Sequence, residues 1–200
     1  ASLYRNVADL LMDAYTAPEF YRNQIDYFGG RMLKLIRQLA DAGADIVCCG
    51  GNVANGSMAG PRFFEENVLP FEIDFTAKVR EMGVYYLYHN CGDAKSLYPL
   101  YSSVGMNIFE TLTPPPAADN DLQAAFEMFD SGIVLSGGVD QIDFLVHATP
   151  EDIKKKVREI LAIARPHGNF ILAASDYFSE GTHYENVKAF AEAGKEFGAL

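Results

Sequence analysis

A repeated alternation of short apolar runs and longer helix-type segments constrains the fold of this chain more than any other feature. The runs are apolar at consecutive positions, which is typical of strands buried on both faces of a parallel sheet. Each run is followed by a loop rich in glycine or polar residues and then by a segment with helical periodicity. Strands are therefore predicted at 45–50, 84–90, 107–112, 133–139 and 169–175.

The alternation predicts an α/β fold in which parallel strands are joined by right-handed helical crossovers. Five such units are too few to close an eightfold barrel. The residues alone leave two architectures open, an open doubly wound sheet and the latter part of a (β/α)8 barrel. No GxGxxG or phosphate-binding glycine loop follows any of the runs, which weakens the nucleotide-binding version of the first architecture. In either case, functional side chains are expected just beyond the carboxyl ends of the strands.

The overall composition narrows the class of protein. With 200 residues, 49% of them hydrophobic, the chain is long enough for one domain with a large core. Its net charge of −11, without a lysine or arginine cluster, disfavours nucleic acid and anionic membranes as partners, and no apolar run is long enough to span a membrane. Three cysteines, two of them adjacent, do not form a disulfide framework, which predicts a reducing, cytoplasmic location. The sequence starts inside a helix-type segment, so we expect it to be part of a longer protein.

His89 and Cys91 close the second predicted strand, in the segment 84–93 that reads VYYLYHNCGD. Side chains at positions i and i+2 of a strand point to the same face, so both can face one point beyond the strand's end. An imidazole and a thiolate side by side suit zinc. The alternative is a buried strand with a hydrogen-bonded histidine and an unreactive cysteine.

Other polar residues lie in or after the predicted strands. Glu110 occupies the middle of the third strand, where a buried carboxylate needs a partner or a metal. We predict that it is a ligand, the partner of a ligand or a base, and the alternative is a strand-end salt bridge. Asp140 ends the fourth strand and is predicted to contact substrate. Asn55, in the loop after the first strand, is a candidate for binding a polar substrate, although turn chemistry explains it as well. We interpret Cys48 and Cys49 as small core residues.

Seven motifs follow one another along the chain in a recognisable order: AGADI at 42–46, NGSMAGPRFF at 55–64, NVLPF at 67–71, HNCGD at 89–93, LSGGVD at 135–140, TPEDI at 149–153 and YENVKAF at 184–190. With these motifs the chain resembles the uroporphyrinogen decarboxylase superfamily, which includes the cobalamin-dependent methyltransferases. The resemblance extends over nearly the whole chain and implies a (β/α)8 TIM barrel. Residues 1–200 are expected to form the C-terminal portion of that barrel as one domain, with the N-terminal strands absent from this chain.

The two branches of this superfamily use the site positions differently. In the methyltransferases, a His-x-Cys on one strand and a cysteine after the last strand hold zinc. His89 and Cys91 match the first pair, and the last cysteine falls at Asp176 in this chain. The decarboxylases place a catalytic histidine at that same position and an active-site serine at the loop position of residues 54–55, and this chain has neither. The resemblance therefore favours the methyltransferase branch.

The resemblance implies zinc-assisted methyl transfer between a corrinoid (cobalamin) carried on a partner protein and a small acceptor such as a thiol or a folate. Asp176 is predicted to complete a His–Cys–Asp zinc site. Alternatively it is an acid, a base or a substrate-binding group in a site without metal. Tyr177, the next residue, is predicted to form part of the substrate pocket. Two other functions stay open, a uroporphyrinogen-type decarboxylase without cofactor and a non-catalytic barrel that binds a small molecule.

Overall fold

The computed structural model describes residues 1–198 and contains one sheet of five parallel strands. The strands lie side by side in sequence order, and every neighbouring pair is parallel. Each strand falls within a segment that the sequence predicted, so the predicted parallel α/β architecture is confirmed. The strands are β1 (Ile46–Gly50), β2 (Tyr85–His89), β3 (Ile108–Leu112), β4 (Val134–Val139) and β5 (Phe170–Ala174).

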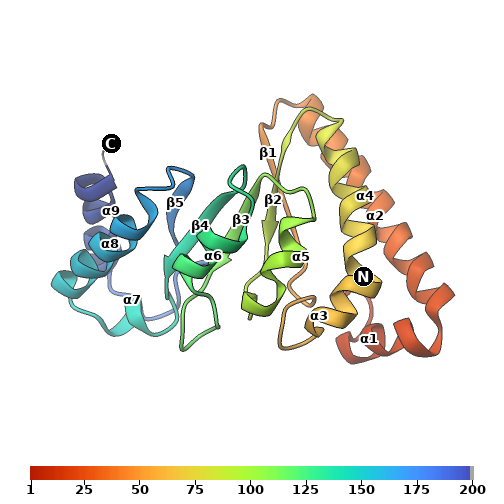
Figure 1. Ribbon diagram of the computed structural model, residues 1–200, viewed down its shortest axis with the longest axis horizontal. Coiled ribbons are helices and arrows are strands. Elements are labelled where there is room, and N and C mark those ends of the chain that lie inside the picture. The colour runs from red at the N-terminus through yellow and green to blue at the C-terminus, as the bar shows by residue number, and fades with distance from the viewer. Residues whose placement is uncertain (199–200) are drawn as a thin grey trace.

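Helices connect the consecutive strands (Figure 1). The long helices α2 and α4 lie at the end of the sheet formed by β1 and β2, and α8 and α9 lie at the end formed by β5. Among residues 1–198, no helix combines the length and the apolar character needed to cross a lipid bilayer. The α-helices are α1 (Val7–Thr16), α2 (Pro18–Asp41), α3 (Gly60–Phe63), α4 (Leu69–Arg80), α5 (Tyr98–Ser102), α6 (Leu122–Met128), α7 (Phe144–His147), α8 (Pro150–Ala164) and α9 (Tyr184–Gly198).

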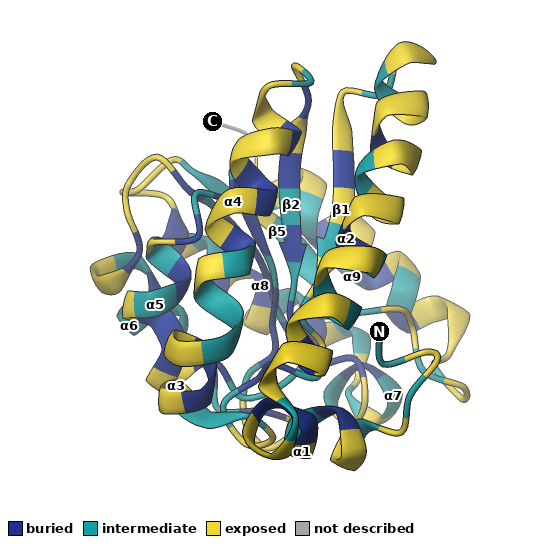
Figure 2. Ribbon diagram, turned by 90° about the vertical axis from the view of Figure 1, so that its right-hand side faces the viewer, coloured by how far each residue is buried: buried dark blue, intermediate teal, exposed yellow. Residues whose placement is uncertain are grey.

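One face of the sheet packs against the helices and forms the core. Val47, Tyr88 and Phe109 from three neighbouring strands belong to one apolar cluster with side chains of α2, α4, α5 and α6. Val139 of β4 belongs to a second cluster, which includes buried residues of α8 and α9. Figure 2 shows buried residues on the inner faces of the helices and exposed residues on their outer faces. Each apolar side chain of this kind that is removed from water stabilises the fold by about 1.5–3 kcal/mol.

The outer strands β1 and β5 each pair on one side only within the described part of the chain. Their side chains are correspondingly exposed, Ile46 to 49% and Ile171 to 47%. Cys48 is exposed too, because it alternates with helix-facing neighbours and points to the other face of the sheet. The interpretation of Cys48 as a core residue is therefore wrong. Cys49, on the helix-facing side, is partly buried against the core.

The helical segment before β2 is interrupted just ahead of Pro70. A π-helical turn (Phe64–Val68) lies between α3 and α4. Proline has no N–H and its ring crowds the carbonyl group four residues earlier, so a wider turn before Pro70 relieves that contact. Leu69 still donates its N–H to the carbonyl oxygen of Phe64. The helix therefore continues as α4, which packs on α2 and β2.

Candidate metal centre and active site

Four polar side chains from three strands gather at the carboxyl end of the sheet. His89 is the last residue of β2 and lies beside Glu110 of β3 in the strand ladder. Cys91 follows β2, and Asp176 follows β5. These positions meet because the carboxyl ends of the parallel strands lie at the same edge of the sheet.

The imidazole ring of His89 lies between two carboxyl groups. Its Nδ1 is 2.8 Å from Oε2 of Glu110, and its Nε2 is 3.9 Å from Oδ2 of Asp176. The hydrogen bond with Glu110 raises the pKa of His89, burial opposes this rise, and the charges of Glu110 and Asp176 reinforce it. When the neutral ring donates its Nδ1–H to Glu110, the lone pair on Nε2 is free on the side of Asp176.

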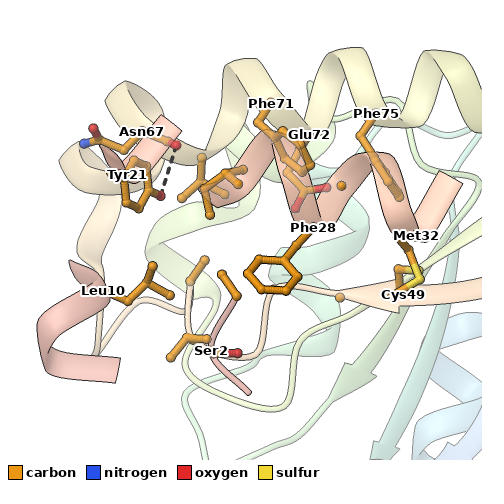
Figure 3. A pocket seen from close by; sticks show the side chains of 18 of the residues that line it. Ser2, Leu10, Tyr21, Phe28, Met32, Cys49, Asn67, Phe71, Glu72 and Phe75 are labelled. Atoms are coloured by element: carbon orange, nitrogen blue, oxygen red, sulfur yellow. Dashed lines mark hydrogen bonds between the residues drawn. The ribbon is translucent and has the colours of Figure 1, made fainter. Parts of the chain in front are cut away.

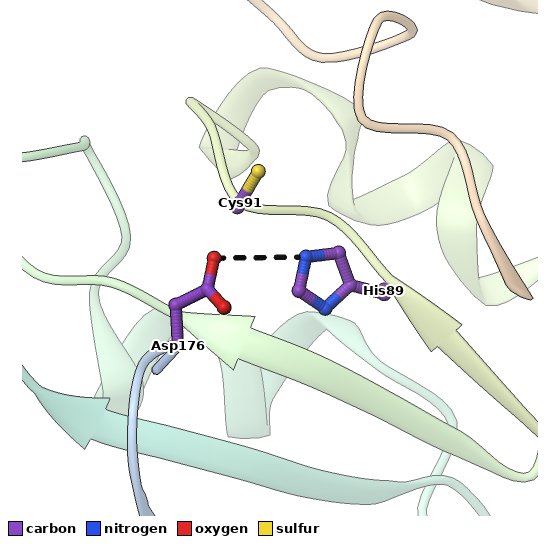
Figure 4. A group of neighbouring side chains, drawn as sticks. All are labelled: His89, Cys91 and Asp176. Carbon is purple, nitrogen blue, oxygen red and sulfur yellow. Dashed lines mark ion pairs between the residues drawn. The ribbon is translucent and has the colours of Figure 1, made fainter. Parts of the chain in front are cut away.

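His89, Cys91 and Asp176 are placed as candidate ligands of one metal ion (Figure 4). One nitrogen, one sulfur and one carboxylate oxygen from these residues lie within 4.8 Å of one another. His89 and Asp176 are half-buried, whereas Cys91 is exposed. Partial desolvation and the neighbouring Asp176 carboxylate raise the pKa of the Cys91 thiol. A metal ion is therefore needed to make this sulfur a thiolate at neutral pH.

β3 contains an irregularity next to Glu110 that the sequence did not predict. Thr111, the next residue, has a φ angle of 72°, in the left-handed region that β-branched residues rarely adopt. The Thr111 hydroxyl donates a hydrogen bond to the carbonyl oxygen of Asn90, between His89 and Cys91 in the chain. Threonine is common in regular strands, so its residue type gave no signal of this conformation.

The sequence profile of the family described as Uroporphyrinogen decarboxylase (URO-D) matches residues 1–197, almost the whole chain. The chain belongs to the uroporphyrinogen decarboxylase family. The resemblance seen in the order of the sequence motifs is thereby confirmed.

Curated relatives in this family are methyltransferases. The methylated-thiol–coenzyme M methyltransferase of Methanosarcina mazei is 26% identical over 154 residues, which cover 77% of this chain and 38% of the relative. The methylcobamide:CoM methyltransferase of Methanosarcina acetivorans is 20% identical over 185 residues, which cover 92% of this chain and 51% of the relative. The chain thus lies on the methyltransferase side of the uroporphyrinogen decarboxylase family, and its matches span 38% and 51% of the length of these relatives.

A solved structure shows which of the two predicted architectures is present. A methyltransferase from Methanosarcina mazei superimposes with a TM-score of 0.83 at 20% identity, over 97% of this chain and 54% of that chain. A likeness at this level of identity concerns the fold. Together with the five parallel β/α units, it identifies this chain as a partial (β/α)8 barrel rather than a doubly wound sheet.

Asn55, predicted to bind substrate, supports the loop that carries Cys91. Its Nδ2 donates to the carbonyl oxygen of Asn52 at 2.9 Å, and its Oδ1 accepts the N–H of Met58 at 3.0 Å. The buried Asn55 side chain also packs against Gly92, where an added Cβ atom would lie 2.5 Å from Nδ2. A contact between Asn55 and substrate stays a prediction.

Asp140 and Tyr177 are the other two residues predicted to bind substrate. The buried carboxylate of Asp140 accepts the backbone N–H groups of Ile142 at 2.8 Å and Phe144 at 3.3 Å, and so turns the chain into α7. Tyr177 is 80% exposed, and its backbone N–H donates to Oδ1 of Asp176 at 2.8 Å. Within residues 1–198, no hydrogen bond or ion pair joins either side chain to the metal-ligand candidates. Their roles toward substrate also stay predictions.

A second polar feature lies away from the candidate metal centre. Glu72 of α4 lines an apolar cavity of about 310 Å³ bordered by α1, α2, α4 and β1, beside Phe28 and Phe71 (Figure 3). The residue is 8% exposed, and its Oε2 has no hydrogen-bond partner among residues 1–198. Burial raises the pKa of Glu72 from 4.5 to about 7, although the Tyr86 hydroxyl limits the rise. This buried acid was not among the site residues predicted from the sequence.

Proposed function

We propose that this protein transfers a methyl group between a corrinoid on a partner protein and a small thiol, with zinc bound by His89, Cys91 and Asp176. The observation that carries the proposal is the grouping of these three ligand atoms within 4.8 Å, with Glu110 on the other nitrogen of the histidine ring. Zinc-bound histidines almost always have a carboxylate, a carbonyl group or a water on that second nitrogen. The names of the relatives support a methylcobamide as donor and coenzyme M, a thiol, as acceptor.

The donor set and its spacing fit a catalytic zinc site. Zinc binds nitrogen, sulfur and oxygen at about 2.0–2.3 Å, so its ligand atoms lie roughly 3–4 Å apart. The ligand atoms of this site are at most 4.8 Å apart, and small side-chain rotations of the exposed Cys91 and the half-buried Asp176 bring them into that range. Three protein ligands leave the fourth position of a tetrahedral site open for a substrate.

Each residue of the cluster has a distinct task. His89 and Cys91 supply a nitrogen and a sulfur ligand, and Asp176 supplies an oxygen that is harder and donates less charge than a thiolate. Glu110 holds Nδ1 of the histidine ring and so keeps Nε2 free for the metal. When bound here, zinc lowers the pKa of the acceptor thiol, so that a thiolate is available at neutral pH.

The transfer exchanges one bond to the methyl carbon for another. The acceptor sulfur attacks that carbon, the S–C bond forms and the Co–C bond breaks. Both electrons of the broken bond stay with cobalt, which leaves as cob(I)alamin, and the thiol proton passes to solvent. Cys91 is exposed at this edge of the sheet, so a corrinoid held by a partner can approach it. The same residues allow the reverse transfer.

Metal analysis and a methyl-transfer assay test the proposal together. Protein purified from zinc-containing medium should hold about one zinc per chain. It should convert methylcob(III)alamin and 2-mercaptoethanesulfonate into cob(I)alamin and the methylated thiol, which the absorbance of the corrinoid reports. Absence of zinc under metal-replete conditions, or release of carbon dioxide from uroporphyrinogen without any corrinoid reaction, would refute the proposal in favour of a decarboxylase.

Variants of Asp176 test its part in the site. Asp176→Ala should weaken zinc binding by about tenfold or more, and Asp176→Cys should restore or raise it. Unchanged zinc content in Asp176→Ala would mean that the carboxylate is an acid, a base or a substrate-binding group instead. For His89→Ala, which should lose zinc, the matched control is His147→Ala: His147 is also near a carboxylate, at 3.7 Å from Asp143, but on the surface.

A further inference from the structure

We propose that Thr111 is a positioning residue for the metal centre, because its left-handed backbone and its hydroxyl group fix Glu110 and Asn90 relative to each other. This inference rests on the proposed metal site and names a residue that touches neither metal nor substrate. It concerns how the fold holds the histidine ligand in one orientation.

The backbone of β3 contains one extra residue at this point. Three residue steps from Phe109 to Leu112 lie opposite two steps from Leu135 to Gly137 in β4, which is a β-bulge. Phe109 and Leu112 both belong to the apolar cluster beneath the helices. A regular strand would place residues 109 and 111 on that side and Leu112 at the barrel mouth. The bulge therefore removes an apolar side chain from the mouth and leaves Glu110 there.

The conformation of Thr111 makes this bulge possible and needs support from its surroundings. At a φ angle of 72°, a β-branched residue is strained, and such residues persist only where neighbouring contacts fix them. Gly137 provides room for the bulge, because an added Cβ atom there would lie 2.6 Å from the backbone nitrogen of Leu112. The neighbouring strand thus has space for the extra residue of β3.

The hydroxyl group of Thr111 supplies the contact that fixes it. It donates to the carbonyl oxygen of Asn90, and the N–H of Asn90 donates to the carbonyl oxygen of Glu110 at 3.4 Å. The peptide groups on both sides of Asn90 are thus held by β3, and this residue stands between the two candidate ligands of β2. Thr111 is 1% exposed and Asn90 is fully buried, so water cannot replace the lost bond. Without the hydroxyl group, the orientation of Glu110 toward His89 is no longer fixed.

Four substitutions separate this role from a general loss of packing. Thr111→Val keeps the shape and removes the hydroxyl group, and Thr111→Ser keeps the hydroxyl group. Thr111→Gly accepts the left-handed backbone without strain and also lacks the hydroxyl group, so it serves if the valine variant does not fold. Thr76→Val is the matched control, because Thr76 is also 1% exposed but its hydroxyl group has no partner among residues 1–198.

Metal binding gives the first readout. Zinc affinity is measured by chelator competition, and the bound geometry by the visible spectrum of the Co²⁺-substituted protein. Thr111→Val and Thr111→Gly should weaken zinc binding by about 10–100-fold and change the Co²⁺ spectrum, as expected for loss of an orienting contact. Thr111→Ser and Thr76→Val should stay within about threefold of wild type. Folded valine and glycine variants with wild-type affinity and spectrum would overturn the inference.

Nitrogen-15 NMR of the metal-free protein at alkaline pH gives a readout that does not depend on the proposed function. In wild type, the neutral ring of His89 should carry its proton on Nδ1, where Glu110 accepts it. Thr111→Val should shift the ring toward the Nε2–H tautomer, and the control should not. A wild type that binds neither zinc nor Co²⁺ would refute the metal site, yet the tautomer would still support or overturn the role of Thr111.

Discussion

Two glutamates of this chain, Glu110 and Glu72, occupy contrasting surroundings. Glu110 of β3 lies at the open carboxyl end of the sheet, 2.8 Å from an imidazole nitrogen. Glu72 of α4 lies in an apolar cavity, and its Oε2 has no hydrogen-bond partner within residues 1–198. Glu110 therefore has a hydrogen-bond partner, the imidazole ring of His89. The carboxyl group of Glu72 is buried, which favours the neutral acid, and the Tyr86 hydroxyl offsets this only in part.

The comparison shows that hydrogen-bond partners, and not burial alone, decide whether a carboxyl group in this fold stays ionised and orients a neighbour or takes up a proton. A paired Glu110 orients a neighbouring ring and so serves chemistry at the site. Glu72, whose Oε2 has no partner among residues 1–198, makes the stability of the folded state depend on pH without contacting the candidate metal centre. Experiments on each glutamate should therefore affect different properties, metal affinity for one and pH-dependent stability for the other.

The largest change in stability is expected for Glu72→Gln. The folded protein holds the proton of Glu72 up to about pH 7, whereas the unfolded chain releases it near 4.5, so stability falls as pH rises between these values. The glutamine variant cannot ionise and lacks this loss. Its free energy of unfolding relative to wild type should therefore rise by on the order of 3 kcal/mol between about pH 4 and pH 8. Urea unfolding at both pH values measures this difference.

Two observations check the Glu72 prediction. Glu65→Gln, at an exposed position of the same helical segment, should show no comparable pH-dependent difference. Zinc affinity of Glu72→Gln should equal that of wild type, since the cavity lining does not include the candidate ligands. A glutamine variant whose stability follows wild type across the whole pH range would show that Glu72 is solvated or paired in solution.

A smaller change, in metal affinity rather than stability, is expected for Glu110→Gln. The amide keeps the size of the side chain but loses the charge that favours the Nδ1–H tautomer of His89. Zinc binding should weaken by about 10–100-fold, or roughly 1.4–2.7 kcal/mol. Chelator competition measures the affinity, and Glu127→Gln on the exposed face of α6 is the control. Equal zinc affinities of Glu110→Gln and wild type would show that Glu110, like Glu72, does not affect the metal site.

The smallest change is expected for Thr149→Ala, at the start of α8. Thr149 and Asp152 form a capping box, in which each side chain accepts the other residue's backbone N–H. Its loss should cost about 1 kcal/mol of stability. The cost, measured by thermal or urea unfolding, should be smaller at acidic than at neutral pH, because the hydrogen bonds of Thr149 lower the pKa of Asp152 and this contribution is lost as pH falls. Zinc affinity should be unchanged. Thr16→Ala, which removes an exposed hydroxyl group at the end of α1, should change stability by less than about 0.5 kcal/mol. A cost that is larger at acidic than at neutral pH would contradict this account of the capping box.

A signal for Glu72 was present in the sequence. Val68, Glu72, Phe75 and Val79 recur every three to four residues, the spacing of one helix face, and Phe75 and Val79 are fully within the core. An acid at such a position predicts either a buried partner or a raised pKa. The site residues predicted from the sequence were instead the polar residues in and after the strands, because barrels have their sites at the carboxyl ends of the strands.

The sequence by itself determined the elements and their order. Consecutive apolar positions, helical periodicity and glycines at the turns depend on neighbours along the chain, so the five strands and their parallel order could be predicted. The His-x-Cys spacing likewise predicted, from local strand geometry, that His89 and Cys91 face one point, and the two side chains do lie close together although Cys91 lies just beyond the end of β2.

Tertiary structure alone decided the contacts between strands. The 2.8 Å contact of Glu110 with His89 depends on the register of β2 and β3, in which these two residues are partners. The left-handed backbone of Thr111 beside it could not be expected from its residue type. Asp176 approaches the histidine from β5, whereas the Asp140 carboxylate binds the backbone of its own turn. Both aspartates follow a strand in the sequence and look alike there. Their difference arises because hydrogen-bond partners are set by distances in space, which local periodicity does not encode.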